Sequence, residues 1–336
     1  GKHGLIMTTY KELKGSQVQV VSSDPTFLEG QVWYNTTSNT LKGFKLIATG
    51  AWSTGGSLNT ARRYVGTAAA DSSSGIAFGG NTSGSTYVDN TESYNGSTWT
   101  EVNDLNHAIG IHGGTGTATA AISFGGYDTE VRAYTETWNG TNWTEVNALN
   151  SARSSIGAAG TNTAALGYGG YTGGSPVNSH RVDLTELWNG SNWTEVNDLS
   201  VGKNSVAANG TSTSALATGG YSSAGATVGT AESWNGSNWT ETGDLNTARY
   251  SAGGAGADNT SALVFGGTGP PSRLAVAEQF NGTGWTEVAD LNTGREDINS
   301  GGSGTVTAAL CVGGDDGSPT GATEEYNGTS WSEQTD

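Results

Sequence analysis

Hydrophobic and polar positions follow one order along the chain, and that order occurs six times. Each copy has a run of small and apolar residues ending in Gly-Gly, then a Glu-x-aromatic-Asn-Gly segment, then a tryptophan followed by Thr/Ser-Glu. The tryptophans of the last segment recur every 44 to 50 residues, at Trp52, Trp99, Trp143, Trp193, Trp239, Trp285 and Trp331. A period of this length indicates stacked supersecondary units, because one unit cannot bury its apolar face alone.

Within one period the pattern predicts four short strands, which we name A to D. In the third copy they are residues 152–160, 164–168, a strand ending at 186–188, and 193–196. Asn189-Gly190 separates strands C and D, and Asn-Gly between strand-like runs indicates a hairpin, because both residues tolerate a positive φ. Four antiparallel strands with an apolar stripe facing the next unit predict a blade of an all-β propeller.

The number of blades depends on how the first repeat is counted. Residues 58–62 follow Trp52 at the spacing at which 245–249 follow Trp239, so Trp52 would occupy strand D of a preceding blade. Residues 17–21, 31–34 and 41–46 alternate roughly as strands do. We therefore favour seven blades, with 1–15 as an N-terminal arm, 16–54 as a divergent first blade or attachment segment, and 55–336 as six repeats. A six-bladed ring with a separate N-terminal arm is the alternative.

The order of elements resembles the kelch repeat. The resemblance rests on the apolar run, Gly-Gly, Glu-x-aromatic, the tryptophan five residues on, and the Leu-Asn-Thr-Ala-Arg link at 58–62 and 245–249. It covers about residues 52–336, although the turn between strands C and D is shorter than is usual in kelch proteins. The resemblance implies a kelch-like β-propeller of four-stranded antiparallel blades.

Composition and charge exclude several classes of partner. The 54 glycines could suggest disorder, but 11 Trp, 12 Tyr and 6 Phe, many at fixed phase, favour a packed fold. A net charge of −17 disfavours binding to nucleic acid or to an anionic membrane surface. We find no signal peptide or membrane span, so we expect no membrane insertion. No Asp-x-Asp-x-Asp-Gly run indicates a calcium site.

Charged residues recur with the repeat. A glutamate lies on every strand C, and a basic residue opens strand A in five of six copies, with Ile109 as the exception. We expect each base to pair with a strand-C glutamate, within or between blades, because six copies of a pair need a structural cause. The glutamates are Glu92, Glu136, Glu186, Glu232, Glu278 and Glu324, and the bases are Arg62, Arg153, Lys203, Arg249 and Arg295.

Candidate chemistry is sparse, and we expect a non-enzyme without cofactor or metal. Copper oxidases that share the kelch-like fold hold the metal with two His and two Tyr, one of them linked to Cys. Here Cys311 occupies a core position of the repeat, and the few histidines, His3, His107, His112 and His180, do not form such a set. Four acids lie outside the repeat, and we interpret them as solvated loop residues: Asp183, Asp297, Asp315 and Asp316.

The connections between strands B and C vary most, and in a propeller they share one face with the D–A connections. Binding function in repeat proteins resides in such variable loops. Three tyrosines follow a Gly-Gly there, and exposed Tyr beside Ser, Gly and Asn makes an adaptable contact surface for sugars or proteins. The candidate ligand-binding residues are therefore Tyr127, Tyr171, His180, Arg181 and Tyr221.

Residues 17–25 and 29–42 resemble a segment of structural proteins of tailed bacteriophages, in which Gly/Thr/Asn-rich kelch-like arrays follow such a segment, particularly in marine phages. This resemblance implies a virion surface protein: a tail fibre, spike or capsid decoration. We expect it to be an oligomer that meets other virion proteins through its N-terminal segment and adheres to a host-surface glycan or protein. A secreted bacterial lectin-like propeller that binds polysaccharide is the alternative.

Overall fold

The computed structural model describes residues 19–21, 32–37, 40–43, 56–83, 86–174, 180–270, 272–298 and 304–334. The chain divides into two units, Gly1–Ser53 and Thr54–Asp336. The first unit contains a three-stranded sheet of β1 (Gln19–Val21), β2 (Val32–Asn35) and β3 (Thr40–Gly43). In this sheet β1 runs parallel to β2, and β2 runs antiparallel to β3.

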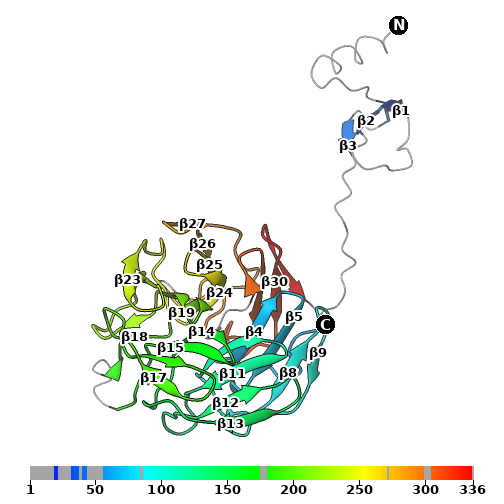
Figure 1. Cartoon of the computed structure of the whole chain (residues 1–336). Coiled ribbons are helices and arrows are strands. Elements are labelled where there is room, and N and C mark those ends of the chain that lie inside the picture. Colours follow the sequence, from blue (N-terminus) through cyan, green and yellow to red (C-terminus); the bar gives the residue numbers. More distant parts are fainter. Residues whose placement is uncertain are drawn as a thin grey trace. The chain divides into compact units, whose positions relative to one another are not determined.

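The described part of the second unit forms six four-stranded antiparallel sheets arranged in a ring (Figure 1). Blade 1 has β4 (Gly66–Asp71), β5 (Ser74–Phe78), β8 (Thr91–Tyr94) and β9 (Trp99–Glu101); blade 2 has β10 (Gly113–Thr117), β11 (Ala120–Phe124), β12 (Thr135–Trp138) and β13 (Trp143–Val146); blade 3 has β14 (Gly157–Thr161), β15 (Ala164–Tyr168), β16 (Thr185–Trp188) and β17 (Trp193–Glu195).

Blade 4 has β19 (Ala207–Thr211), β20 (Ser214–Thr218), β22 (Ala231–Trp234) and β23 (Trp239–Thr242); blade 5 has β24 (Gly253–Asp258), β25 (Ser261–Phe265), β26 (Ala277–Phe280) and β27 (Trp285–Glu287); blade 6 has β28 (Gly304–Thr305), β29 (Ala308–Val312), β30 (Thr323–Tyr326) and β31 (Trp331–Gln334). Two short antiparallel pairs, β6 (Asn81–Thr82) with β7 (Thr86–Tyr87) and β18 (Lys203–Asn204) with β21 (Tyr221–Ser222), complete the strands. The chain is thus an all-β, six-bladed propeller.

The core lies between blades, and the strand-D tryptophan forms much of it. Trp143 of blade 2 packs against Phe78 of blade 1 with 4.7 Å between ring centroids, and Trp193 packs against Phe124 of blade 2 at 4.8 Å. Strand A remains small because these rings lie over it: a Cβ on Gly114 of blade 2 would lie 2.8 Å from the Phe78 ring of blade 1. The repeat of small residues and aromatics is therefore the packing pattern of neighbouring sheets.

Six blades close the ring. The innermost strand of blade 6, β28, packs against β4 of blade 1, and side chains of both blades form one core cluster that includes Leu58, Tyr94 and Leu310. The Tyr94 hydroxyl donates to Glu325 Oε1 at 2.7 Å, and the Leu58 amide donates to the Gly321 carbonyl at 2.9 Å. The space beside blade 1 that a seventh blade needs is occupied by blade 6.

The preference for seven blades is therefore wrong, and the six-bladed alternative is confirmed. Each later D–A link lies on the blade that precedes it in the sequence, and the link at 58–62 lies in the same way on blade 6. Strand D of blade 6, however, is β31, near the other end of the chain. A D–A link can dock on a blade without being joined to that blade's strand D. Trp52, which suggested the seventh blade, lies outside the described residues.

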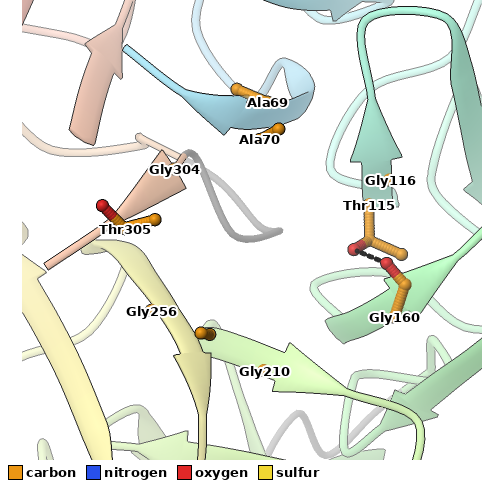
Figure 2. A pocket seen from close by; sticks show the side chains of 10 residues that line it. Ala69, Ala70, Thr115, Gly116, Gly160, Gly210, Gly256, Gly304 and Thr305 are labelled. Carbon is orange, nitrogen blue, oxygen red and sulfur yellow. Dashed lines mark hydrogen bonds between the residues drawn. The ribbon is translucent and has the colours of Figure 1, made fainter. Parts of the chain in front are cut away.

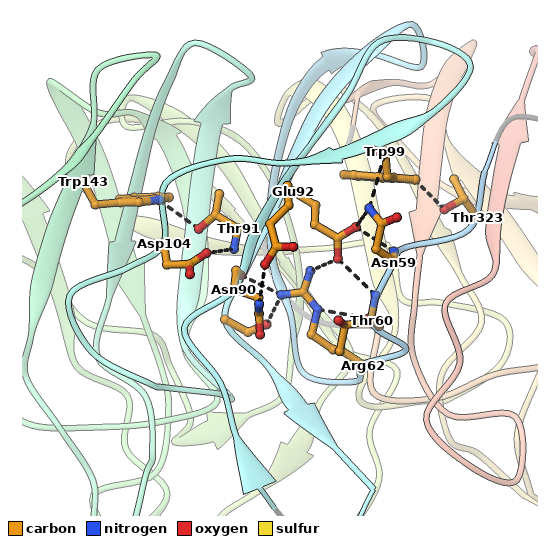
Figure 3. Close-up of polar contacts among 12 residues, drawn as sticks. Asn59, Thr60, Arg62, Asn90, Thr91, Glu92, Trp99, Asp104, Trp143 and Thr323 are labelled. Atoms are coloured by element: carbon orange, nitrogen blue, oxygen red, sulfur yellow. Dashed lines mark hydrogen bonds and ion pairs between the residues drawn. The ribbon is translucent and has the colours of Figure 1, made fainter.

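The predicted ion pairs are confirmed, and all five lie within blades. Arg62 Nη2 lies 2.7 Å from Glu92 Oε1, and both side chains are almost fully buried (Figure 3). Arg62 Nη1 also donates to the Gly79 and Asn90 carbonyls, while Glu92 Oε2 accepts the backbone and side-chain N–H groups of Asn59. The other pairs are Arg153–Glu186, Lys203–Glu232, Arg249–Glu278 and Arg295–Glu324. Each pair ties the D–A link to strand C of the blade that the link leads into.

The six Asn-Gly turns join strands C and D as predicted, but their geometry differs from the expected one. The glycine of each turn has a positive φ, as at Gly190 (φ 90), whereas none of the six asparagines does. Asn189 instead accepts two backbone N–H groups on its side-chain oxygen, from Ser191 and Asn192, at 2.9 Å each. The asparagine therefore serves as a side-chain acceptor within the turn.

Candidate binding face at the channel mouth

The B–C and D–A connections lie on one face, as the sequence predicts. In every blade the residue directly after the Gly-Gly pairs through the backbone with a residue of the D–A link: Asn81 with Arg63, Tyr127 with Gly110, Tyr171 with Ser154, Tyr221 with Asn204, Thr268 with Tyr250, and Asp315 with Glu296. We call this surface, built from those twelve residues and the ring described next, the mouth face.

A ring of six equivalent residues surrounds the propeller axis on the mouth face. All six have a left-handed backbone: Tyr64 (φ 56), Ile111 (φ 58), Ser155 (φ 53), Ser205 (φ 55), Ser251 (φ 53) and Asp297 (φ 57). Such a φ is uncommon outside glycine. We call these residues the inner ring, and no other non-glycine residue among those described has a positive φ.

Backbone hydrogen bonds link the inner ring from blade to blade. The Ser155 amide donates to the Ile111 carbonyl at 2.7 Å, and the Ser205 amide donates to Ser155 at 3.0 Å. The other links run from Tyr64 to Asp297 (3.0 Å), from Ile111 to Tyr64 (3.3 Å), from Ser251 to Ser205 (2.9 Å), and from Ile298 to Ser251 (3.4 Å). The closed cycle holds the strained backbone in place and makes the opening rigid.

The inner ring and the residues beside it line a cavity of about 410 Å³. One side is neutral and carries small polar groups on blades 3 to 5: Ser155, Asn204, Ser205 and Ser251. The opposite side is charged and lies on blades 1 and 6: Arg63, Tyr64, Glu296 and Asp297. The volume lies within the range of small-molecule sites.

Asp297 is the most perturbed acid of the cavity. It is 7% exposed, and the hydroxyl groups of Tyr64 and Ser251 donate hydrogen bonds to its carboxylate. Burial raises the pKa of Asp297 to about 6, and the Glu296 carboxylate adds to this, while the hydroxyls and Arg63 act in the opposite direction. Burial and the neighbouring Asp297 also raise the pKa of Tyr64. A buried carboxylate at an open cavity is a ready hydrogen-bond acceptor.

Two arginines pair with the carboxylates on this side of the mouth face, and of the two only Arg63 lines the cavity. Arg63 Nη1 lies 2.9 Å from Asp315 and 3.7 Å from Asp297. Arg273 contacts Asp315 at 2.8 Å and Glu296 at 3.1 Å. Of the charged side chains that line the cavity, two carboxylates, Glu296 and Asp297, face one guanidinium group, that of Arg63, which leaves one negative charge in excess.

Two of the four off-pattern acids contradict the expectation of solvated loop residues. Asp297 is 7% exposed and Asp315 is 4% exposed, because the mouth face folds over both of them. Asp316 is exposed and Asp183 is half-buried. The positions of Asp297 and Asp315 in loops did not reveal that their side chains are buried, since the residues that cover these side chains belong partly to other blades.

The three tyrosines proposed from the sequence are half-buried on the mouth face, and none of them is among the residues that line the cavity. Arg181 lies over the Tyr221 ring with 4.3 Å to the centroid, and its Nε donates to Asn204 Oδ1 at 3.0 Å. Tyr171 packs edge-on against His180 with 6.5 Å between centroids. Arg181 and Tyr221 therefore adjoin the cavity through Asn204.

Tyr127 lies apart from that group and packs against Tyr87, with 5.7 Å between ring centroids. The inner ring itself was missed by the sequence reasoning. The sequence does contain a signal for it. In most copies the residue two positions before the inner-ring residue is basic, and the residue directly after it is apolar. The inner-ring position between them changes from copy to copy, at residues 64, 111, 155, 205, 251 and 297.

The cavity at the opposite end of the central channel is smaller, and the described residues that line it are uncharged. This cavity of about 160 Å³ is lined by glycine, alanine and threonine residues of the strand-A ends (Figure 2). Thr115 Oγ1 donates to the Gly160 carbonyl there at 3.0 Å. Gly116 has φ 121, and a Cβ on it would lie 2.3 Å from the Ala120 carbonyl oxygen. None of the described residues that line this end has a titratable side chain, so the mouth face is the better candidate site.

Compared with known proteins, the chain matches no family model and none of the curated proteins. Within the described ranges, no group of three or more His, Cys, Asp or Glu is placed to hold a metal ion. The same residues include no helix with the length and apolar character that crossing a membrane requires.

Proposed function

We propose that this chain is a non-enzymatic surface protein of a tailed-bacteriophage virion, in the role of tail fibre, spike or capsid decoration. It adheres through the mouth face to a host surface or to a virion partner. One observation carries the adhesive role: the six blades repeat their core, and five of them repeat the buried ion pair, while the residues of the mouth face differ from blade to blade. A scaffold that varies along one face is typical of binding modules.

The sequence of the N-terminal unit supports placement on a virion. Residues 17–25 and 29–42 resemble a segment of phage structural proteins, and the order of elements in 52–336 resembles kelch-like arrays that follow such segments. We propose that this unit meets other virion proteins and brings copies of the chain together as an oligomer. The charge of −17 supports a solvent-facing role at the particle surface without nucleic acid as a partner.

A secreted bacterial lectin-like propeller that binds polysaccharide is the second candidate. The observation in its favour is the cavity, whose neutral side presents three serine hydroxyls and one asparagine amide. Both candidates use the same face, and they differ in where the protein resides.

The test is to locate the chain. Purified phage particles from a culture that produces the protein are examined by mass spectrometry and by electron microscopy with an antibody raised against the full chain. We expect the chain in the particles, with labelling at the tail or on the capsid surface. Presence in the culture medium but not in particles would favour the lectin, and turnover of a sugar substrate would contradict the non-enzyme proposal.

A further inference from the structure

We infer that the cavity of the mouth face is the binding site for a neutral, hydroxyl-rich saccharide of one or two pyranose rings. The inference rests on the proposed adhesive function, and it assigns that function to the inner ring and its direct neighbours. The tyrosines proposed from the sequence do not line this cavity, and of these Tyr221 adjoins it by pairing with Asn204.

Rigidity is the first argument. The inner ring is tied into a closed cycle of backbone hydrogen bonds, with links such as 2.7 Å between Ser155 and Ile111. A preformed opening of about 410 Å³ does not have to be ordered when a ligand enters. A small ligand is therefore bound with little loss of conformational freedom.

The polar groups suit vicinal hydroxyls. Ser155 and Ser205 are half-buried, and each hydroxyl can both donate and accept a hydrogen bond. The Asn204 amide is oriented, because its oxygen accepts from Arg181 at 3.0 Å and its nitrogen lies 3.3 Å from the Ser205 hydroxyl. A sugar, whose hydroxyls also act in both directions, can use each of these groups.

Tyrosine rings complete the chemistry of a saccharide site. Tyr64 and Tyr250 both line the cavity, and Tyr250 is supported by an edge contact with Tyr221 at 5.4 Å between centroids. Aromatic rings offer a flat apolar surface to the C–H face of a pyranose. The Tyr64 hydroxyl, which donates to Asp297, can still accept a hydrogen bond.

Charge selects a neutral sugar. Among the charged residues that line the cavity, Glu296 and Asp297 outnumber Arg63 by one, and the whole chain carries −17. A sialic acid, uronate or sulfate group would meet like charge at the site and across the protein surface. A basic side chain of a protein partner is the competing occupant, but Asp297 already has two hydroxyl donors and Arg63 beside it.

The experiment measures binding of the full chain to an array of glucose-, galactose- and mannose-based di- and trisaccharides. The same backbones carrying sialate, uronate or sulfate are printed beside them, and calorimetry follows with the best neutral binder. We expect binding to at least one neutral sugar and weaker binding to its acidic analogue. Equal or stronger binding of the acidic analogue would overturn the inference.

Two variants test whether the sugar binds in the cavity. Tyr250→Ala removes a ring from the lining, and Ser205→Asn narrows the opening with a residue that tolerates a positive φ. We expect Tyr250→Ala to weaken binding about tenfold, roughly the loss of one aromatic contact. Tyr134→Ala is the matched control, since Tyr134 stacks on His107 with 4.0 Å between centroids and does not line the cavity. Circular dichroism confirms that each variant is folded.

The outcomes separate this inference from the proposed function. Sugar affinity unchanged in both cavity variants, or binding to a basic peptide and to no sugar on the array, overturns the inference while a particle location would still support the virion role. Sugar binding at the cavity by a chain absent from particles supports the inference and removes the virion role.

Discussion

Trp99 donates its indole N–H to the hydroxyl of Thr323, at 3.1 Å and across 224 residues of sequence (Figure 3). The bond joins blade 1 to blade 6. Equivalent bonds join the next blades, from Trp143 to Thr91 at 3.0 Å and from Trp193 to Thr135 at 3.0 Å. The first and last blades are thus joined by the same Trp–Thr hydrogen bond that joins neighbouring blades elsewhere in the ring.

Replacing Thr323 by valine tests the closed ring. Thr323→Val keeps the side-chain shape but leaves the buried Trp99 N–H without its acceptor, so we expect a loss of about 1–3 kcal/mol in the free energy of unfolding. Thr135→Val, inside the ring, is the matched control and should cost about the same. Urea denaturation measures both, and a neutral Thr323→Val beside a costly Thr135→Val would mean that blades 1 and 6 do not seal.

In blade 6 the missing hydrogen-bond acceptor can be added instead of removed. Trp331 would find a threonine at position 277 if blade 5 followed blades 1 to 3, but the residue is Ala277, and the Trp331 indole nitrogen has no hydrogen-bond partner within the described residues. Ala277→Thr should supply one and raise the free energy of unfolding by about 1 kcal/mol. Ala231→Thr should gain less, because Trp285 already donates to the Gly243 carbonyl at 2.8 Å. Equal gains would contradict this account of the tryptophan bonds.

Blade 2 lacks the buried cation of its neighbours. Glu136 is 3% exposed and accepts two N–H groups of Asn106, but it forms none of the ion pairs found among the described residues, because Ile109 stands where the other blades have Arg or Lys. We expect Ile109→Arg to raise the free energy of unfolding by about 1–2 kcal/mol. Arg153→Ile, which leaves Glu186 alone, should lower it by about 3–5 kcal/mol. Thermal and urea unfolding measure both, and a destabilising Ile109→Arg would show that blade 2 has repacked around the isoleucine.

His112 makes the protein sensitive to acid. It is fully buried at a position that is Val65, Ile156 or Val206 in other blades, and burial, with Arg62 adding to it, lowers its pKa to about 3. The folded state favours the neutral ring, so stability falls by about 1.4 kcal/mol per pH unit as the pH drops from 6.5 towards 3. His112→Val should match the wild type near pH 7 and exceed it increasingly at pH 5 and 4. Parallel stability curves for the two proteins would refute the assignment.

Asp297 has the opposite pH dependence. Its pKa is raised, mainly by burial, from 3.8 to about 6, so the folded state favours the protonated form and stability falls as the pH rises through this window, by up to about 3 kcal/mol. Asp297→Asn removes the charge and tolerates φ 57. We expect the variant to be more stable than the wild type at pH 7.5, with the difference shrinking towards pH 4. A difference that grows on acidification would show that the carboxylate is stabilised by its neighbours.

Much of the fold could be predicted from short-range pattern. The run ending at Gly169-Gly170, the turn at Asn189-Gly190 and the tryptophan at 193 mark strand ends within a single copy, and the strands lie there. The pairing of Arg153 with Glu186 was also predictable, because a charge that recurs at one phase needs a recurring partner. These features depend on residues of one blade.

The candidate site depended on residues that the repeat does not keep. Tyr171, Arg181 and Tyr221 could be placed on the mouth face because they follow Gly-Gly motifs or lie in the variable connections. Ser155 and Ser205 were not singled out, and Asp297 was interpreted as a solvated loop residue, since serine and aspartate in a loop ordinarily indicate a solvated turn.

The sequence by itself determined the antiparallel blade, its buried ion pair and the face that varies, because each of these is a local pattern repeated in register. The tertiary structure alone decided that six blades close the circle, that residues 58–62 dock on a blade to which they are not joined, and that six left-handed residues meet around one cavity. The physical reason is that closure of the ring and the meeting of the six residues at one cavity both depend on the angle between neighbouring sheets. This angle arises from side-chain packing between blades, and the spacing of residues within one blade does not reveal it.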